Sequence, residues 1–266
     1  MKKKYIYIFI GLVTLTLFYF YFNDIKKLVI KDKNSNFMNE VVSAKYEVLS
    51  SEVNYFENRT GFYAEPKTPG NYPGIIMIHE WWGLNDHIKE SAKTLSAQGY
   101  RVLAVDLFGS IAATPVGAIA QTKGLDQDKA VENMRAAKKF LSGKGSIKIG
   151  SLGWCFGGAQ SLQIAVNEKL DATVIYYGNL IEDKEKLKQL NSPVLGIFGA
   201  TDGQVPVEKV NLFGANLREL NIQNEIKIYD GVGHAFANPT GLSFAPNETK
   251  DAWIKTLEFL NKNLKN

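Results

Sequence analysis

The sequence contains a single cysteine, Cys155, among its 266 residues. One cysteine cannot form a disulfide within the chain, and it cannot supply the cysteine-rich ligand set of a structural zinc site. The fold must therefore be stable on its hydrophobic core alone. The 233 residues that follow residue 33 are enough to build such a core as one large α/β domain.

The body of the chain also lacks net charge. The formal charge of the whole chain is +4, but residues 1–33 hold seven lysines and only two acidic residues. The other 233 residues carry 24 positive and 25 negative side chains. Because a protein that binds nucleic acid needs a basic surface to meet the phosphates, we expect no nucleic-acid partner.

The N-terminal segment differs in character from the rest. Lys2, Lys3 and Lys4 precede residues 5–22, which are eighteen residues without a charged side chain. As a helix with a rise of about 1.5 Å per residue, this run would span roughly 27 Å, close to the hydrocarbon thickness of a bilayer. A cleaved signal peptide is the alternative, but no small-x-small cleavage site follows the run. We therefore predict one N-terminal hydrophobic helix in residues 1–27, kept as a transmembrane anchor or uncleaved signal.

The lysines on both sides of this run set its expected orientation. The N-terminal trio and the α-amino group outweigh the four lysines of residues 26–33 once Asp24 and Asp32 are considered. We therefore expect a cytoplasmic N-terminus, a membrane partner for residues 5–22, and a body on the extracytoplasmic side. Residues 28–45 are polar and aperiodic, which is typical of a linker. Residues 46–266 then form the main domain.

Within this domain, short apolar runs alternate with helical patterns. Strand-like pieces in residues 46–65 are followed by buried strands expected at residues 74–78, 101–106, 147–151, 172–177, 194–199 and 225–229. Helices are expected at residues 86–98, 126–141, 159–166, 183–190, 206–220 and 249–260. This alternation predicts an α/β fold with a mostly parallel twisted sheet and helices on both faces. In such a sheet, the loops after the carboxyl ends of the strands hold the ligand site.

Cys155 lies in one of these loops, within Gly153-Trp-Cys-Phe-Gly157. The pattern Gly-x-Cys-x-Gly between a strand and a helix is that of a nucleophile elbow, with cysteine in place of the usual serine. The two glycines suit a strained turn in which side chains would collide with the strand and the helix. A helix N-terminus beside the sulfur favours thiolate over thiol. Taken alone, without these neighbours, the residue would be read as a buried structural cysteine.

Two further loops carry an acid and a base. Asp202 follows the strand at residues 194–199, and His234 follows the strand at residues 225–229. Nucleophile, acid and base thus follow three different strands in the chain order of α/β-hydrolases. In this arrangement His234 withdraws the thiol proton of Cys155, while Asp202 fixes the imidazole tautomer. Asp202 alone could be a turn former and His234 alone a surface residue, but their joint placement favours a catalytic triad.

The loop after the first buried strand offers more candidates. In this fold the loop supplies one N–H group of the oxyanion hole, and the residue after the nucleophile supplies the other. We assign these N–H groups to Trp81 and Phe156. Glu80 could cap the next helix, be solvated, or hold or accept the thiol proton.

The chain from about Tyr46 to Leu264 resembles the dienelactone hydrolase family, whose members are also called carboxymethylenebutenolidase-like proteins. The matching segments are Ile78-His-Glu-Trp-Trp-Gly-Leu-Asn85, Gln98-Gly-Tyr-Arg-Val-Leu-Ala-Val-Asp-Leu-Phe-Gly109, Gly153-Trp-Cys-Phe-Gly-Gly158, Thr201-Asp202 and Gly233-His-Ala-Phe-Ala-Asn-Pro239. The resemblance implies an α/β-hydrolase fold and a triad of Cys155, Asp202 and His234. It also implies that Glu80 pairs with the resting thiol and exchanges its proton when substrate binds.

The chain departs from this family where a charged lactone would be bound. Family members that act on dienelactone bind its carboxylate with arginines, one of them shortly after the triad histidine. That place holds Asn238 here, and residues 110–127 contain no arginine. Without these cations an anionic lactone loses its bidentate partner, so a neutral ester or lactone is the better substrate.

These observations together predict a cysteine-dependent hydrolase that cleaves a small ester or lactone through a thioester on Cys155. We expect no metal and no organic cofactor, and the sequence leaves the oligomeric state open. Two alternatives remain at this point. The site could act on another acyl substrate, such as a thioester or a peptide, or the domain could be a non-catalytic binding module anchored at the membrane.

Overall fold

The computed structural model describes residue 37 and residues 41–265. The strands are β1 (Val48–Phe56), β2 (Arg59–Pro66), β3 (Gly74–Ile78), β4 (Arg101–Val105), β5 (Ile149–Trp154), β6 (Ala172–Tyr176), β7 (Val194–Gly199) and β8 (Asn224–Tyr229). The helices are α3 (Asp86–Ser96), α4 (Pro115–Lys123), α5 (Gln127–Gly143), α6 (Phe156–Asn167), α7 (Lys184–Leu187), α8 (Val207–Glu219) and α9 (Pro246–Leu264).

The predicted membrane span at residues 5–22 and most of the predicted linker lie outside the described residues, so both stay predictions. Within residues 37 and 41–265, no helix combines the length and the apolar character that a membrane crossing requires.

The eight strands form one sheet in the order β1-β2-β4-β3-β5-β6-β7-β8. The strands from β3 to β8 pair in parallel, and β1 and β2 form an antiparallel hairpin at one edge. Strand β8 forms the other edge and pairs only with β7. The predicted α/β fold with a mostly parallel sheet is confirmed. Because the strands run in parallel, the loops that follow β3, β5, β7 and β8 lie at the same end of the sheet.

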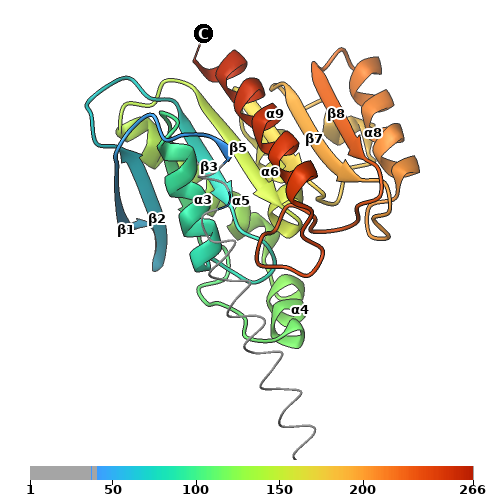
Figure 1. Cartoon of the computed structure of the whole chain (residues 1–266), viewed down its shortest axis with the longest axis horizontal. Coiled ribbons are helices and arrows are strands. Elements are labelled where there is room, and N and C mark those ends of the chain that lie inside the picture. The colour runs from blue at the N-terminus through green and yellow to red at the C-terminus, as the bar shows by residue number, and fades with distance from the viewer. Residues whose placement is uncertain (1–36, 38–40, 266) are drawn as a thin grey trace, which may run out of the picture.

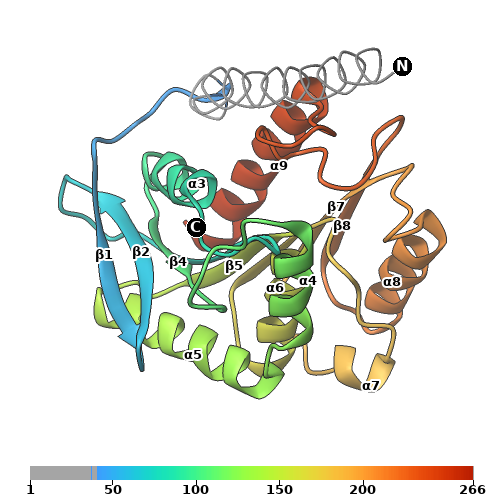
Figure 2. The same ribbon diagram turned by 90° about the horizontal axis from the view of Figure 1, so that it is seen from below.

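Helices cover both faces of this sheet (Figure 1). Figure 2, turned by 90°, shows α3 and α9 on one face and α5, α6 and α8 on the other. Successive side chains of a strand point to opposite faces, so each inner strand contributes to both cores. In β3, for example, Ile75 and Met77 join the cluster under α3 and α9, while Ile76 and Ile78 join the cluster under α5 and α6.

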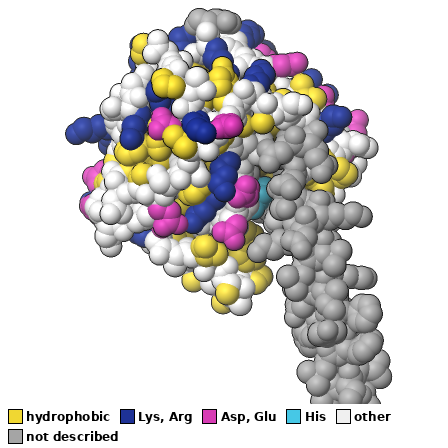
Figure 3. Space-filling view, turned by 60° about the vertical axis from the view of Figure 1, so that its left-hand side comes forward, with side chains coloured by type: hydrophobic (Ala, Val, Ile, Leu, Met, Phe, Trp, Pro, Cys, Tyr) yellow, Lys and Arg dark blue, Asp and Glu magenta, His cyan; other side chains and the backbone are white. Residues whose placement is uncertain are grey.

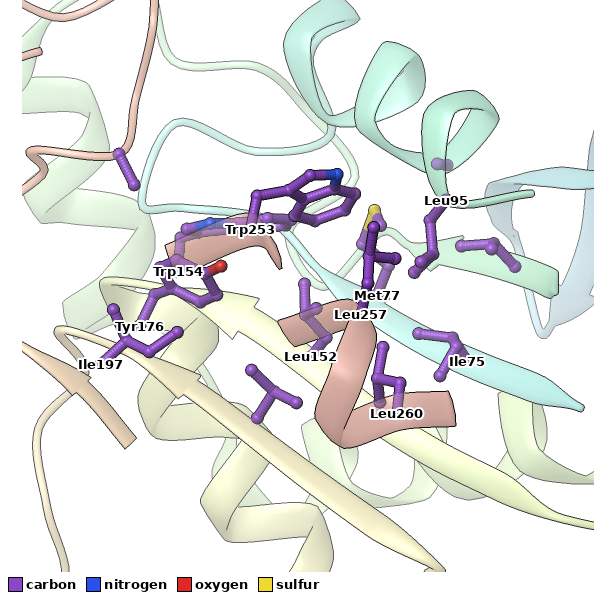
Figure 4. Close-up of a cluster of buried hydrophobic side chains, with 14 of the residues drawn as sticks. Ile75, Met77, Leu95, Leu152, Trp154, Tyr176, Ile197, Trp253, Leu257 and Leu260 are labelled. Carbon is purple, nitrogen blue, oxygen red and sulfur yellow. The ribbon is translucent and has the colours of Figure 1, made fainter. Parts of the chain in front are cut away.

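The core under α9 is rich in aromatic side chains (Figure 4). Trp253 of α9 and Tyr176 of β6 are fully buried, and Trp154 lies beside Tyr176 with a ring centroid distance of 5.6 Å. The Tyr176 hydroxyl donates to the carbonyl of Ala252, 3.1 Å away. The C-terminal helix is therefore fixed to the carboxyl end of β6.

Two element predictions differ from the structure. Helix α4 was not predicted, although Thr114 caps it and Pro115 occupies its first turn, both typical of a helix start. Only Ala118 of this helix is buried, so the helix presents no apolar face to the core. The elbow also differs in its bounds. Strand β5 continues to Trp154 and α6 begins at Phe156, so the turn consists of Cys155 alone.

Charges of both signs are mixed on the face shown in Figure 3, where lysine and arginine side chains alternate with acidic ones. This pattern fits the near neutrality of the body of the chain. It offers no basic stripe on this face for a phosphate backbone to follow.

Candidate active site

Cys155 stands between β5 and α6 with a backbone φ of 54° and ψ of −118°. A residue with a side chain rarely adopts a positive φ, and such strain is concentrated at functional sites. The N–H of Cys155 donates to the carbonyl of Tyr176, 2.9 Å away, which ties the turn to the neighbouring strand. The backbone thus has the strained turn that the Gly-x-Cys-x-Gly pattern predicts, with Cys155 half-buried.

The flanking glycines are required by space. A Cβ atom on Gly153 would overlap the carbonyl of Gly157, and a Cβ atom on Gly157 would overlap the carbonyl oxygens of Ile78 and His79. The start of α6 therefore lies directly against the end of β3. This contact brings the loop after β3 close to Cys155.

The three predicted triad residues lie together at the carboxyl end of the parallel strands. The Nε2 atom of His234 lies 3.0 Å from the Cys155 sulfur, and its Nδ1 atom lies 2.8 Å from Oδ2 of Asp202. The other carboxylate oxygen of Asp202 accepts hydrogen bonds from the N–H groups of Gln204 at 2.8 Å and Val205 at 3.2 Å. Because the carboxylate can only accept, Nδ1 of His234 carries a proton and Nε2 faces the sulfur.

The electrostatics of the triad favour a charged imidazole. Burial alone lowers the pKa of His234, but hydrogen bonds to Asp202 and Cys155, together with their charges, raise that pKa to about 10. Burial alone raises the pKa of Asp202, but hydrogen bonds from His234 and from the Gln204 N–H outweigh it and lower that pKa. These contacts make His234 a stronger proton acceptor than a free imidazole, and they place its Nε2 atom beside the sulfur of Cys155.

Glu80, the fourth predicted site residue, is buried. Its carboxylate accepts a 2.5 Å hydrogen bond from the side-chain amide of Asn238. The amide is itself fixed, because its oxygen accepts from the N–H and the hydroxyl of Thr240 at 2.9 and 2.7 Å. Burial raises the pKa of Glu80 to about 7, although His234 and Asn238 act in the opposite direction. Among the described residues, Glu80 is thus bound to Asn238 while the sulfur is bound to His234, and its exchange of a proton with the thiol stays a prediction.

His79 holds the loop that carries Glu80. Its Nε2 atom accepts the N–H of Leu107 at 3.2 Å, so its Nδ1 atom is the donor to the carbonyl of Glu80 at 2.6 Å. The ring is fully buried, and burial lowers the pKa of His79, which keeps it neutral. A neutral imidazole thereby links the ends of β3 and β4 and orients the residues that follow Glu80.

The two residues predicted to form the oxyanion hole both line the site. Trp81 follows the end of β3, and Phe156 is the first residue of α6, where helix geometry leaves the N–H without a partner in the helix. The close approach of Gly157 to Ile78 and His79 brings these two segments together. Their assignment as oxyanion donors remains a prediction, and it is consistent with this position.

These residues surround a cavity of about 600 Å³. It is lined by Glu80, Trp81, Trp82, Thr122, Cys155, Phe156, Ala159, Tyr177, Asn179, Gln204, Val205, His234, Ala235, Asn238, Gly241 and Ser243. This lining, taken over the part of the chain that the structure describes, contains neither lysine nor arginine. The size suits a small organic molecule. The described residues also hold no cluster of three or more His, Cys, Asp or Glu side chains suited to a metal ion.

Some lining residues were not anticipated from the sequence. Tyr177 follows β6 with a positive φ of 37°, and its ring packs edge-on against His234 at a centroid distance of 5.2 Å. Its position after a strand end was the signal that could have marked it. Thr122 lies on α4, a helix that was not predicted, so no sequence signal placed it here. The contact of Asn238 with Glu80 joins residues 158 positions apart and follows only from the fold.

The model of the dienelactone hydrolase family matches residues 60–264, which is most of the chain. The chain belongs to the dienelactone hydrolase family. A protein of Saccharolobus solfataricus that bears a provisional carboxymethylenebutenolidase name is 28% identical over 241 residues, covering 76% of this chain and 93% of its own. Protein usf of Aquifex pyrophilus is 30% identical, covering 77% and 93%. A dienelactone hydrolase-like promiscuous phosphotriesterase from metagenomic libraries, at 24% identity, has the same fold with a TM-score of 0.72 and covers 81% of this chain and 98% of its own. This dienelactone hydrolase relative is therefore a hydrolase that acts on esters or lactones.

The buried carboxyl of Glu80 should make the stability of the hydrolase depend on pH. Burial raises the pKa of Glu80 from 4.5 to about 7 in the folded state. The folded protein therefore binds this proton more tightly than the unfolded chain, so stability falls as pH rises from about 4.5 to 7 and stays at the lower value above it. The loss amounts to about 3 kcal/mol. In Glu80→Gln this loss should be absent, and thermal unfolding at several pH values between 4.5 and 8 measures it.

The readout is the difference in Tm between Glu80→Gln and the parent protein at each pH. It should grow in favour of Glu80→Gln as pH rises through this window. Glu258→Gln, on the exposed face of α9, serves as the control for loss of one surface charge. A difference for Glu80→Gln that is the same at every pH would contradict the assignment of a buried carboxyl that titrates near neutrality.

Proposed function

We propose that this hydrolase cleaves a neutral ester or lactone through a covalent thioester on Cys155, with His234 as the base and Asp202 as its partner. One observation carries the proposal. Two successive hydrogen bonds, of 2.8 Å between Nδ1 of His234 and the Asp202 carboxylate and of 3.0 Å between Nε2 of His234 and the sulfur, connect a carboxylate, an imidazole and a thiol at the wall of a cavity. This arrangement activates a nucleophile and orients its base.

In the first half of the reaction, His234 accepts the thiol proton at Nε2 and the sulfur of Cys155 attacks the carbonyl carbon of the ester. The carbonyl oxygen becomes negative and accepts hydrogen bonds from the N–H groups of Trp81 and Phe156. When the carbonyl re-forms, the bond to the ester oxygen breaks. His234 gives its proton to the departing alkoxide, which leaves as an alcohol or, from a lactone, stays attached through the acyl chain.

In the second half, a water molecule attacks the thioester and His234 accepts the water proton. The bond between carbon and sulfur breaks, the carboxylic acid leaves, and the proton returns to the sulfur. Asp202 remains ionised throughout and stabilises the imidazolium that forms twice in each cycle. No redox partner is needed, because the reaction consumes only ester and water.

The lining of the cavity favours an uncharged acyl group. Its ionisable residues are Glu80, Cys155, Tyr177 and His234, and no lysine or arginine among the described residues faces it. Where a cation would balance a substrate carboxylate, Asn238 instead donates to Glu80. A second carboxylate would therefore be buried without a partner, which is strongly unfavourable.

A matched pair of substrates tests this selectivity. p-Nitrophenyl hexanoate and p-nitrophenyl hydrogen adipate have acyl chains of the same length, but the second ends in a carboxylate. We expect kcat/KM for the neutral ester to be at least about tenfold higher, because the cavity offers the carboxylate no lysine or arginine and already contains Glu80. Equal values, or a preference for the adipate, would contradict a cavity built for neutral esters.

Thiol labelling separates the hydrolase from the alternatives considered above. A thiol-reactive ester analogue can label only Cys155, because the chain has one cysteine. A hydrolase of this mechanism should be labelled once per chain and protected by competing neutral esters, and it should be slower on peptides than on activated esters. A binding module should show neither protection nor turnover.

A further inference from the structure

Two segments that lack lysine, arginine, aspartate and glutamate contribute residues to the cavity. Residues 107–122 and residues 231–247 contain no Lys, Arg, Asp or Glu, in a chain that is 22% charged. Large apolar side chains are exposed on both, at 58% for Ile111, 77% for Val116, 43% for Ile119 and 96% for Leu242. We call these four residues the rim. Apolar side chains grouped at a binding site mark a surface that meets an apolar phase or a partner.

Chain neighbours of the rim residues line the cavity or contact its lining. Gly241 and Ser243, on either side of Leu242, both line the cavity. Thr122 lines it from α4, the helix that exposes Val116 and Ile119. The N–H of Ala112, next to Ile111, donates to the carbonyl of Trp82, 2.8 Å away. Figure 1 places α4 at the lower end of the molecule, and Figure 3 shows apolar side chains gathered at that end.

The N-terminal part of the chain arrives at the same place. The ring of Phe37 packs edge-on against Phe244, two residues after Leu242, with a centroid distance of 5.0 Å. Only fourteen residues, 23–36, separate Phe37 from the apolar run at residues 5–22. The first described residue, Phe37, thus lies against the loop that carries Leu242, and the chain between it and the apolar run is short. A membrane that holds residues 5–22 is therefore within reach of the face that carries the rim.

We propose that the rim faces a lipid bilayer and that the hydrolase takes its substrate, a neutral lipophilic ester, directly from the membrane. The inference rests on the proposed esterase function and on the predicted span at residues 5–22. An ester dissolved among acyl chains would pass from one apolar phase into another at the mouth, between Leu242 and α4, and would reach Cys155 without crossing water. The absence of Lys, Arg, Asp and Glu along both segments lowers the desolvation penalty of such a contact.

A protein partner fits this surface less well. Interfaces between proteins surround an apolar centre with polar and charged residues that hydrogen-bond across the contact. The two segments of the rim offer no Lys, Arg, Asp or Glu for that purpose. A bilayer needs none, because its acyl chains make no hydrogen bonds.

The test uses the full chain reconstituted in phosphatidylcholine vesicles, with vesicle flotation to verify that the protein is bound. The double variant Val116→Asn and Leu242→Asn makes the rim polar without touching the cavity lining. Its matched control is Ile147→Asn, because Ile147 is 90% exposed but stands before β5, at the opposite end of the strands. Each protein is assayed with p-nitrophenyl dodecanoate dissolved in the vesicles and with p-nitrophenyl acetate in the water phase. Tm is measured for all three proteins.

We expect the double variant to lose about tenfold in kcat/KM on the vesicle-held ester and to stay within about twofold on the acetate, while Ile147→Asn resembles the parent on both. Equal activity of parent and double variant on the dodecanoate would overturn the inference and leave the esterase function intact. A loss on both esters would overturn it too. A dimer in detergent that Val116→Asn and Leu242→Asn abolish would assign the rim to a second copy instead. If the parent hydrolyses neither ester, the proposed function itself fails.

Discussion

Replacing Cys155 with alanine should lower kcat for an activated aryl ester by about 10⁴-fold or more. The sulfur is the atom to which His234 is hydrogen-bonded, and no other thiol exists in the chain to replace it. Alanine leaves the oxyanion donors and the cavity in place, so only the background rate that they support should remain. Steady-state kinetics with p-nitrophenyl acetate measures the change, and burst kinetics on the parent protein should show accumulation of the thioester.

Two controls separate loss of chemistry from loss of structure. Thermal unfolding of Cys155→Ala should change little, because alanine fills most of the same space at the strained turn. The pKa of His234 should fall in this variant, since part of its rise comes from Cys155, and NMR titration of the imidazole measures it. Cys155→Ser keeps a hydroxyl at the same position and should recover at most a small part of the rate. Retained turnover in Cys155→Ala would remove the thiol from the mechanism.

Among single substitutions, replacement of Gly157, two residues after Cys155, should cause the largest loss of stability. In Gly157→Ala the new methyl group would overlap the carbonyl oxygens of Ile78 and His79, which are backbone atoms of a buried strand end. Because backbone cannot rotate away as a side chain can, we expect a loss of about 3 kcal/mol in the free energy of unfolding. This corresponds to a fall in Tm of roughly 10 °C. Differential scanning calorimetry provides the measurement.

Gly143→Ala is the matched control for this change. Gly143 ends α5, and no atom lies within 4 Å of the position that its Cβ would occupy. There the substitution should be neutral or should raise stability by about 0.5 kcal/mol, because alanine restricts the unfolded chain and favours helix. Similar stabilities for Gly157→Ala and Gly143→Ala would show that α6 does not lie as close to β3 as described.

The sequence predicted the features that depend on local pattern and chain order. The alternation of apolar runs and helical stretches led to the parallel sheet, and glycines 153 and 157 marked the turn at Cys155. Because the carboxyl ends of parallel strands lie at one end of the sheet, Asp202 and His234 were then predicted to lie near the sulfur. Each of these inferences needs only a few neighbouring residues and one general property of parallel sheets.

Other features depend on contacts between distant parts of the chain. Asn238 was noted only as the residue in place of an arginine, whereas the structure shows its amide bound to Glu80. Helix α4 exposes most of its surface and lacks the apolar stripe that marks a helix, so its contribution of Thr122 to the cavity could not be foreseen. The exact end of β5 depends on pairing with β3 and β6, which holds Gly153 in the sheet despite its low strand propensity.

The backbone does not support the members of the triad equally. Cys155 follows β5, which has β3 on one side and β6 on the other, whereas His234 follows β8, one of the two edge strands of the described sheet. Edge elements open at a lower free energy than central ones. Mild heating or denaturant would thus release the imidazole while the sulfur is still held in its turn, so inactivation would begin as loss of the base, with the nucleophile intact and reversible on cooling.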